Sequence, residues 1–190
     1  MGPEGTKKLI LDAALDIVRK RGFRTMSIRD ICKKAGVSIG AFYHYYPSRD
    51  ALLNEAFLHF DMTLDDASVQ RYDAMPPMDA IRQVLLDQTE FTANEGFSII
   101  TEYYRALLQS DRREAVSPER AYYQTVRKYV MIAQREGLMD TTPSAEEISE
   151  FLVKFVRGSL VDWCLHDGKY DIMERANREL GPLLDIFRVK

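Results

Sequence analysis

The residues whose types and spacing are best suited to chemistry with a partner gather in residues 28–47. Small or apolar residues recur there at the spacing of two helices joined by a tight turn, at Ile31, Ala35, Val37, Phe42 and Tyr45. Gly36 stands where such a turn requires a positive φ. If Phe42 points inward, the opposite side of the later helix is free to enter a DNA major groove. That side carries Ile39, Gly40, Tyr43 and His44. The spacing predicts a helix-turn-helix; a buried corner of two helices in an ordinary helical protein is the alternative.

Charge is distributed unevenly along the 190 residues of the chain. Residues 1–50 carry ten basic and five acidic side chains, a net charge of +5, whereas the other 140 residues carry 16 basic and 24 acidic side chains, a net charge of −8. A basic segment beside an acidic remainder favours contact with a polyanion at one end of the molecule. Chance variation among solvated charges is the alternative.

Signatures of catalysis and of metal binding are missing from the sequence. It has no GxSxG, no HExxH and no phosphate-binding glycine loop, and its histidines, His44, His59 and His166, lack partners at ligand spacing. Cys32 and Cys164 show neither CxxC nor Cys/His spacing, so no disulfide framework or zinc site is predicted. We therefore expect no enzyme activity, no metal and no cofactor. The lack of a long apolar run and of a signal peptide favours a cytoplasmic protein without a membrane partner.

The elements that must position these residues are all predicted to be helices. Apolar residues recur at helical spacing almost throughout, and alternating strand patterns are missing, so the fold class is all-α. Ser27 with Asp30 predicts a capped second helix, and Ser38 caps the third. A long helix over about residues 49–66 and five further helical segments follow, about nine helices in total. We expect a three-helix helix-turn-helix domain over residues 1–47 and a larger helical domain over residues 48–190.

Over about residues 6–58 the sequence resembles the TetR family of transcriptional regulators. The resemblance rests on the stretches SIRDI at 27–31, AGVSIGAFYHYY at 35–46 and SRDALL at 48–53; later residues are similar only in architecture. It implies a dimeric repressor that a small-molecule effector releases from a palindromic operator in double-stranded DNA. It also implies that residues 48–190 form the effector-binding and dimerisation domain.

The resemblance assigns roles to residues of the helix-turn-helix. Matching positions in the family tend to contact phosphates at Ser27, Ser38, Tyr43, Tyr45 and Arg49, and to lie near base edges at Arg29, Ile39, Gly40 and His44. The chemistry agrees, because hydroxyl groups and an arginine at helix starts are oriented donors for phosphate oxygens. Cys32, Tyr46 and Arg49 stand where alanine, phenylalanine and lysine are common. We expect Cys32 to be a small buried group; a redox sensor is the alternative.

The resemblance further implies an effector cavity among helices four to seven and a homodimer interface formed by the last two helices. Aromatic and sulfur side chains are the candidate ligand-binding residues: Met62, Phe91, Tyr103, Tyr104, Tyr122 and Tyr129. They predict a largely apolar effector, and ordinary core packing is the alternative for each of them. The candidate interface residues are Phe155, Gly158, Ser159, Leu160, Trp163, Leu180, Leu184 and Phe187. Acidic residues of the same region, such as Asp87, Glu90, Glu95 and Glu102, would favour a cationic ligand, or form a solvated face.

Two other functions stay open from the sequence. One is a helical small-molecule-binding or enzymatic protein that keeps an unused helix-turn-helix. The presence of Tyr43 and Arg49, and the net charge of the N-terminal segment, argue against it. The other is a DNA-binding regulator without a small ligand.

Overall fold

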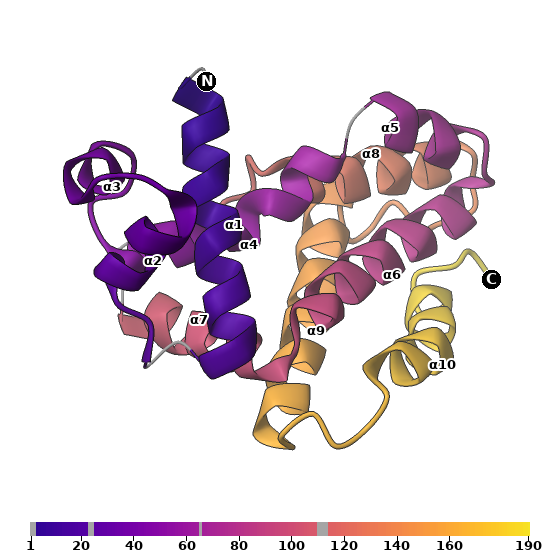
Figure 1. Ribbon diagram of the computed structural model, residues 1–190. Helices are drawn as coiled ribbons and strands as arrows, with labels where there is room; N and C mark the ends of the chain where they lie inside the picture. The colour runs from indigo at the N-terminus through magenta and orange to yellow at the C-terminus, as the bar shows by residue number, and fades with distance from the viewer. Residues whose placement is uncertain (1–2, 23–24, 65, 110–113) are drawn as a thin grey trace.

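The computed structural model describes residues 3–22, 25–64, 66–109 and 114–190. These residues form ten α-helices and no strand, which confirms the all-α prediction. The helices are α1 (Pro3–Arg21), α2 (Ile28–Ala35), α3 (Ile39–Tyr45), α4 (Arg49–Thr63), α5 (Asp66–Asp73), α6 (Pro77–Glu95), α7 (Phe97–Gln109), α8 (Ala121–Arg135), α9 (Ala145–Leu165) and α10 (Ile172–Asp185) (Figure 1). None of the helices in these ranges is long and apolar enough to cross a lipid bilayer.

The helix that the sequence analysis did not predict is α5. It has eight residues, and only Tyr72 among its apolar side chains is fully buried. A helix this short shows no repeated apolar stripe, so its sequence does not distinguish it from a polar loop. The expected single helix over about residues 49–66 ends at Thr63 in the structure.

Helices α1, α2 and α3 form the N-terminal unit, at the left of Figure 1. Ser27 and Asp30 form a capping box at the start of α2, each side chain accepting a hydrogen bond from the other residue's backbone N–H. Gly36 ends α2 with a φ of 69°, in the left-handed region that favours glycine. Ser38 caps α3, and the fully buried ring of Phe42 packs α3 into the core of this unit. Local capping and one apolar anchor therefore set the orientation of α3.

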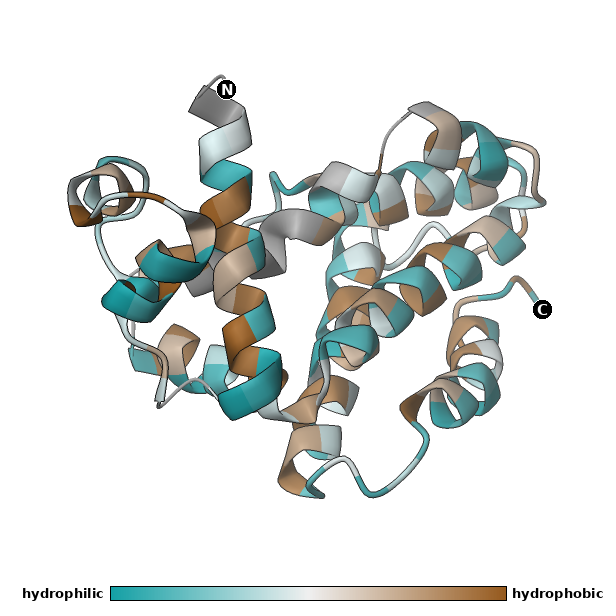
Figure 2. Ribbon diagram, viewed as in Figure 1, coloured by the Kyte–Doolittle hydropathy of each residue, from teal (hydrophilic) through white to brown (hydrophobic). Residues whose placement is uncertain are grey.

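Helix α6 lies at the centre of the larger unit and packs against α8, α9 and α10. Hydrophobic and hydrophilic residues alternate around the helices in Figure 2, as expected for helices that each bury one face. The buried face of α6 also carries the polar side chains of Gln88, Thr89 and Thr92. Polar residues are uncommon on such a face, and Gln88 and Thr92 border an internal cavity described below.

Apolar contacts and an ion pair join the two units within the described ranges. Leu52 of α4 and Ile99 of α7 are buried in the core of the N-terminal unit, whereas Phe60, farther along α4, is buried in the core of the larger unit. Arg19 of α1 donates to both carboxylate oxygens of Glu95, at 2.7 and 2.6 Å, where α6 ends. The N-terminal core therefore takes in residues beyond position 47, the expected domain boundary.

Candidate functional site

A shallow hollow on the N-terminal unit brings together residues from three helices. The α2–α3–α4 hollow is lined by Thr25, Met26, Ser27, Ile28, Arg29, Ile39, Tyr43 and Arg49. Ser27 and Arg29 stand at the start of α2. Ile39 and Tyr43 lie on α3, and Arg49 is the first residue of α4. Five of the nine residues expected to contact DNA thus share one concave surface.

The outer face of α3 is open to solvent. Ile39 is 44% exposed and Tyr43 is 53% exposed, and Gly40 and His44 are exposed beside them. Phe42 occupies the opposite, fully buried side. The side that faces solvent therefore combines apolar, hydroxyl and imidazole groups on a helix whose width suits the major groove of DNA.

The capping serines Ser27 and Ser38 differ in whether the hydroxyl proton is already used in a hydrogen bond. Ser27 Oγ accepts from the Asp30 N–H at 3.1 Å and donates to the Asp30 carboxylate at 2.7 Å. This hydroxyl and the Ser27 backbone N–H lower the pKa of the Asp30 carboxyl. Ser38 Oγ accepts from the Ala41 N–H at 3.0 Å. A hydroxyl that accepts one bond still has a proton to donate, so Ser38 is the better placed of the two to bind a phosphate oxygen.

Arg49 and Tyr45 are partly held by the N-terminal unit. Arg49 is half-buried, and its Nη1 donates to the backbone carbonyl of Met26 at 2.7 Å. Tyr45 is half-buried against the N-terminal core, and its ring meets the ring of His44 edge-on, with centroids 4.9 Å apart. Both side chains are therefore oriented by the fold.

Cys32 lies in the core of the N-terminal unit, 4% exposed. Burial raises the pKa of its thiol. Because the thiolate is the reactive form, a buried thiol with a raised pKa reacts slowly with oxidants. These observations favour the core role of Cys32 over a redox role.

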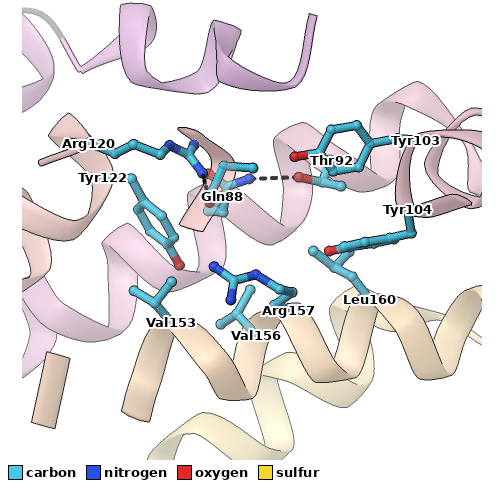
Figure 3. A pocket seen from close by; sticks show the side chains of 11 residues that line it. Gln88, Thr92, Tyr103, Tyr104, Arg120, Tyr122, Val153, Val156, Arg157 and Leu160 are labelled. Atoms are coloured by element: carbon cyan, nitrogen blue, oxygen red, sulfur yellow. Dashed lines mark hydrogen bonds between the residues drawn. The ribbon is translucent and has the colours of Figure 1, made fainter. Parts of the chain in front are cut away.

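An internal cavity of about 40 Å³ lies between α6, α7, α8 and α9 (Figure 3). Its lining residues are Gln88, Thr92, Tyr103, Tyr104, Ala115, Arg120, Tyr122, Val153, Val156, Arg157 and Leu160. Three of the six candidate ligand-binding residues, Tyr103, Tyr104 and Tyr122, are among them. Burial raises the pKa of the Tyr103 hydroxyl to about 12 and raises that of Tyr122 further. These phenols therefore stay protonated at neutral pH.

Two arginines in the cavity wall have different partners. Arg120 Nε and Nη2 donate to the two carboxylate oxygens of Asp61 on α4, at 2.9 and 3.0 Å. Arg157 Nη2 donates to the hydroxyl of Tyr123 at 2.6 Å, and within the described ranges it forms no ion pair with a carboxylate. Among the described residues, the charge of Arg120 is therefore neutralised by a carboxylate, and that of Arg157 is not.

The structure does not bring Phe91 and Tyr129 to this cavity. The Phe91 ring packs on Phe60, with centroids 5.5 Å apart. The hydroxyl of Tyr129 donates to the Asp73 carboxylate at 2.9 Å. Helical spacing marks a buried face without telling core from cavity, and here these two rings serve the core. Met62 lies in α4, and its side chain is outside the described part of the molecule.

Sequence reasoning missed the polar residues of the cavity wall. Gln88 and Thr92 are one helical turn apart, and Gln88 Nε2 donates to Thr92 Oγ1 at 2.7 Å. The available signal was a glutamine inside the apolar stripe of α6, followed by a threonine four residues later. Arg120 and Arg157 gave no comparable signal, because most arginines at such positions are solvated.

The candidate interface residues divide into two groups. Leu160, Trp163, Leu180 and Leu184 are between 1% and 8% exposed and belong to the core of their own chain. Helical spacing shows burial but not which surface buries a residue, so their role at a dimer interface stays a prediction. Phe155, Gly158, Ser159 and Phe187 reach the surface at least in part.

Two members of the surface group, Phe155 and Gly158, belong to a solvent-facing stripe along α9. The α9 stripe consists of residues at three- and four-residue spacing: Phe151, Phe155, Gly158, Asp162 and Leu165. Phe151 is 42% exposed and Leu165 is 77% exposed. A methyl group added at Gly158 would meet no other atom within 4 Å, so the fold of the single chain does not require glycine there.

Comparison with known proteins links the chain to one family. Residues 10–56 match the family of bacterial regulatory proteins of the tetR type. The chain is 29% identical to the HTH-type transcriptional regulator CymR of Pseudomonas putida, over 96% of this chain and 89% of that protein.

Solved structures share the fold. One is Thermus thermophilus FadR, a TetR family transcriptional repressor, in complex with lauroyl-CoA, with a TM-score of 0.76, 23% identity, and coverage of 97% of this chain and 96% of that one. Another is the transcriptional regulator FadR from Bacillus subtilis in complex with stearoyl-CoA, with a TM-score of 0.65, 15% identity, and coverage of 93% and 97%.

Proposed function

The chain belongs to the TetR family of bacterial regulatory proteins and is a DNA-binding transcriptional regulator, and we propose that it is a dimeric repressor released from its operator by a small-molecule effector. In this proposal the N-terminal unit binds DNA, and the rest of the chain binds the effector and forms the dimer. It acts in the cytoplasm, where bacterial operators lie, and it has no catalytic activity.

The observation that carries the proposal is the α2–α3–α4 hollow. It collects oriented donors from the starts of α2 and α4, beside the exposed face of α3. Donors at helix starts fix the position of a protein on phosphates, and an exposed helix can read base edges. We assign phosphate contacts to Ser27, Ser38, Tyr43, Tyr45 and Arg49, and base contacts to Arg29, Ile39, Gly40 and His44. The net charge of +5 over residues 1–50 supports binding to a polyanion.

Helix α4 is the route by which an effector would change DNA binding. It begins at Arg49 in the hollow, and Asp61 near its end holds Arg120 of the cavity wall. A ligand that displaces Arg120 therefore acts on the helix that carries Arg49. The ion pair of Arg19 with Glu95 gives a second connection, from α6 to α1. A ligand shifts such an equilibrium only by its difference in affinity for the two states.

Two related structures with bound ligands support the proposal of a small-molecule effector. FadR from Thermus thermophilus was solved with lauroyl-CoA, and FadR from Bacillus subtilis with stearoyl-CoA. In this chain the cavity of about 40 Å³ has room for about three water molecules, since one needs roughly 10–15 Å³ by this measure. An effector must therefore move part of the wall as it binds, and Tyr104 and Arg157 are half-buried at its edge.

The dimer is proposed to form through the α9 stripe and the adjacent surface of α10. A two-fold axis brings the same patch of both subunits together, and a dimeric operator then has two related half-sites. The exposed ring of Phe151 and the half-buried ring of Phe187 contact each other, with centroids 5.6 Å apart, at one end of this surface. Aromatic side chains are enriched in the centres of such interfaces.

The proposal is tested by selecting genomic fragments that the purified protein retains and by titrating the selected fragment. We expect a near-palindromic sequence with half-site centres about 10 base pairs, or a multiple of this, apart. Binding to that fragment should exceed binding to random DNA by at least about 10³-fold. Enrichment of no sequence, with equal affinity for all DNA, would overturn the proposal.

A further inference from the structure

Two buried polar atoms at the internal cavity have no hydrogen-bond partner among the described residues. They are the hydroxyl of Tyr122 and Oε1 of Gln88, on side chains of residues that are 3% and 8% exposed. A buried polar atom without a partner destabilises the folded protein, so such atoms are rare. Both residues line the cavity (Figure 3), so a molecule bound there can satisfy them.

A cation lies beside these atoms. In Figure 3 the guanidinium of Arg157 lies between Tyr122 and Tyr104. Its positive charge opposes the rise in pKa that burial causes in both hydroxyls. A guanidinium has five N–H donors, and within the described ranges the hydrogen bond to Tyr123 uses one. Arg120, by contrast, is held by both oxygens of Asp61. The cavity wall thus has one guanidinium whose charge no carboxylate of the described part of the chain compensates.

Carboxylates that would suit a cationic ligand lie elsewhere. Asp87 pairs with Arg71, Glu95 with Arg19, and Glu102 with Arg105. None of the three lines the cavity, and neither does Glu90. The electrostatics of the wall therefore favour an anion over a cation.

We propose that the effector of this protein is a compact carboxylic acid whose carboxylate binds Arg157 and the Tyr122 hydroxyl. A donor group on the ligand, where present, meets Gln88 Oε1. This inference rests on the proposed function, because it names the chemistry of that effector site. One uncompensated guanidinium matches one negative charge, and planar carboxylates suit its paired N–H groups.

The remaining walls define the body of the ligand. Val153, Val156 and Leu160 present aliphatic groups, and the rings of Tyr103 and Tyr104 lie on the α7 side. Such walls favour a flat, apolar body next to the carboxylate. The small volume favours a short one, because each added atom requires more of the wall to move.

The test compares benzoate with benzamide, which has nearly the same shape and no charge. We expect benzoate to raise the melting temperature of the full-length protein in proportion to the logarithm of its concentration, and benzamide to do so at least about 10-fold more weakly. Hexanoate and hexanamide repeat the comparison with an aliphatic body. Equal responses to acid and amide would overturn the proposal.

Three variants in the cavity wall test which side chains bind the carboxylate of benzoate. Tyr122→Phe should raise the melting temperature of the ligand-free protein, because it removes a hydroxyl without a partner, and weaken benzoate binding about 10-fold. Arg157→Gln should weaken it by at least about 10-fold, and Arg157→Lys should restore part of the loss because it keeps the charge. Arg178→Gln removes an exposed arginine of α10 and should change nothing. Circular dichroism identifies a variant that does not fold. Unchanged benzoate affinity in folded Tyr122→Phe and folded Arg157→Gln would overturn the assignment.

Failure of this inference is distinguishable from failure of the proposed function. Specific DNA binding that neither acid alters, with no preference for acid over amide, overturns the ligand class and leaves the regulator intact. Loss of specific DNA binding in every condition overturns the proposed function itself.

Discussion

Arg120, at the start of α8, donates to both carboxylate oxygens of Asp61 on α4, at 2.9 and 3.0 Å, with both side chains less than one fifth exposed. The pair is the charged contact between α4 and the cavity wall. Removing one partner of a buried ion pair leaves the other charge without compensation, which destabilises more than the pair stabilises. The contact therefore makes the position of α4 sensitive to changes in the cavity.

Asp61→Asn should lower the free energy of unfolding by about 3 kcal/mol, because Arg120 stays buried without its counter-charge. Urea denaturation measures this change. Lys169→Ala is the control, since Lys169 and Asp167 form a pair whose side chains are 76% and 67% exposed. Breaking it should cost at most about 1 kcal/mol. Equal losses in the two variants would contradict the role given to the buried pair.

Ser38→Ala and Ser144→Ala separate capping from DNA binding. Each serine caps a helix by accepting a backbone N–H at its third helical residue, so each variant should lose about 1 kcal/mol of stability. Only Ser38 lies beside the exposed face of α3, and its free proton is proposed to bind a phosphate. Ser38→Ala should therefore weaken operator binding about 10-fold, and Ser144→Ala should leave it unchanged. Fluorescence anisotropy with labelled operator measures both, and the same affinity in the two variants would remove Ser38 from the interface.

Arg49→Ala and Arg29→Ala should differ in kind. A phosphate contact is blind to sequence, so Arg49→Ala should weaken binding to all DNA and reduce the dependence of log affinity on log salt by about one unit. A base contact is specific, so Arg29→Ala should lose about 1–3 kcal/mol of discrimination at particular base pairs. Titrations at several salt concentrations, with operator and base-pair variants, check both. An unchanged salt dependence in Arg49→Ala would refute its assignment.

The N-terminal half of the site was predictable because its determinants are local. Capping serines, a glycine at a positive φ and one buried phenylalanine fix α2 and α3, and all of them stand within the sixteen residues 27–42. Leu160 shows where this reasoning stops. Its helical spacing indicated a buried residue, but only the packing of α9 against α6 and α8 places it in the cavity wall. Likewise, nothing near Arg120 in the sequence reveals Asp61, which is 59 residues away.

Stability should decrease in acid because several carboxyl groups are stabilised in their charged form. Hydrogen bonds from Lys34, Ser27 and Ser144 lower the pKa values of Asp16, Asp30 and Glu147 below their ordinary values of 3.8, 3.8 and 4.5. A pKa that is lower in the folded state contributes stability above the unfolded pKa, and this contribution is lost as the pH falls through the folded pKa. Urea midpoints should therefore be flat between about pH 7 and pH 5.5 as far as these groups are concerned, and should decrease below about pH 4.5. A rising midpoint below pH 4.5 would contradict these assignments.

Gly158→Arg tests the dimer without disturbing the core of the subunit. Gly158 is exposed in the middle of the α9 stripe, and an added side chain meets nothing within 4 Å in the single chain. Replacing glycine inside a helix generally stabilises it, so an isolated subunit should fold at least as well as the wild type. Across a two-fold axis, however, two arginines would oppose each other and separate the surfaces. We expect Gly158→Arg to sediment as a folded monomer, and Gly158→Ala, which adds one methyl group, to remain a dimer. Because a monomer has only one N-terminal unit to bind DNA, operator affinity should then decrease by about 10²–10⁴-fold. A Gly158→Arg protein that stays dimeric would place the interface on another surface, and a folded monomer with wild-type operator affinity would show that specificity does not depend on pairing the two N-terminal units.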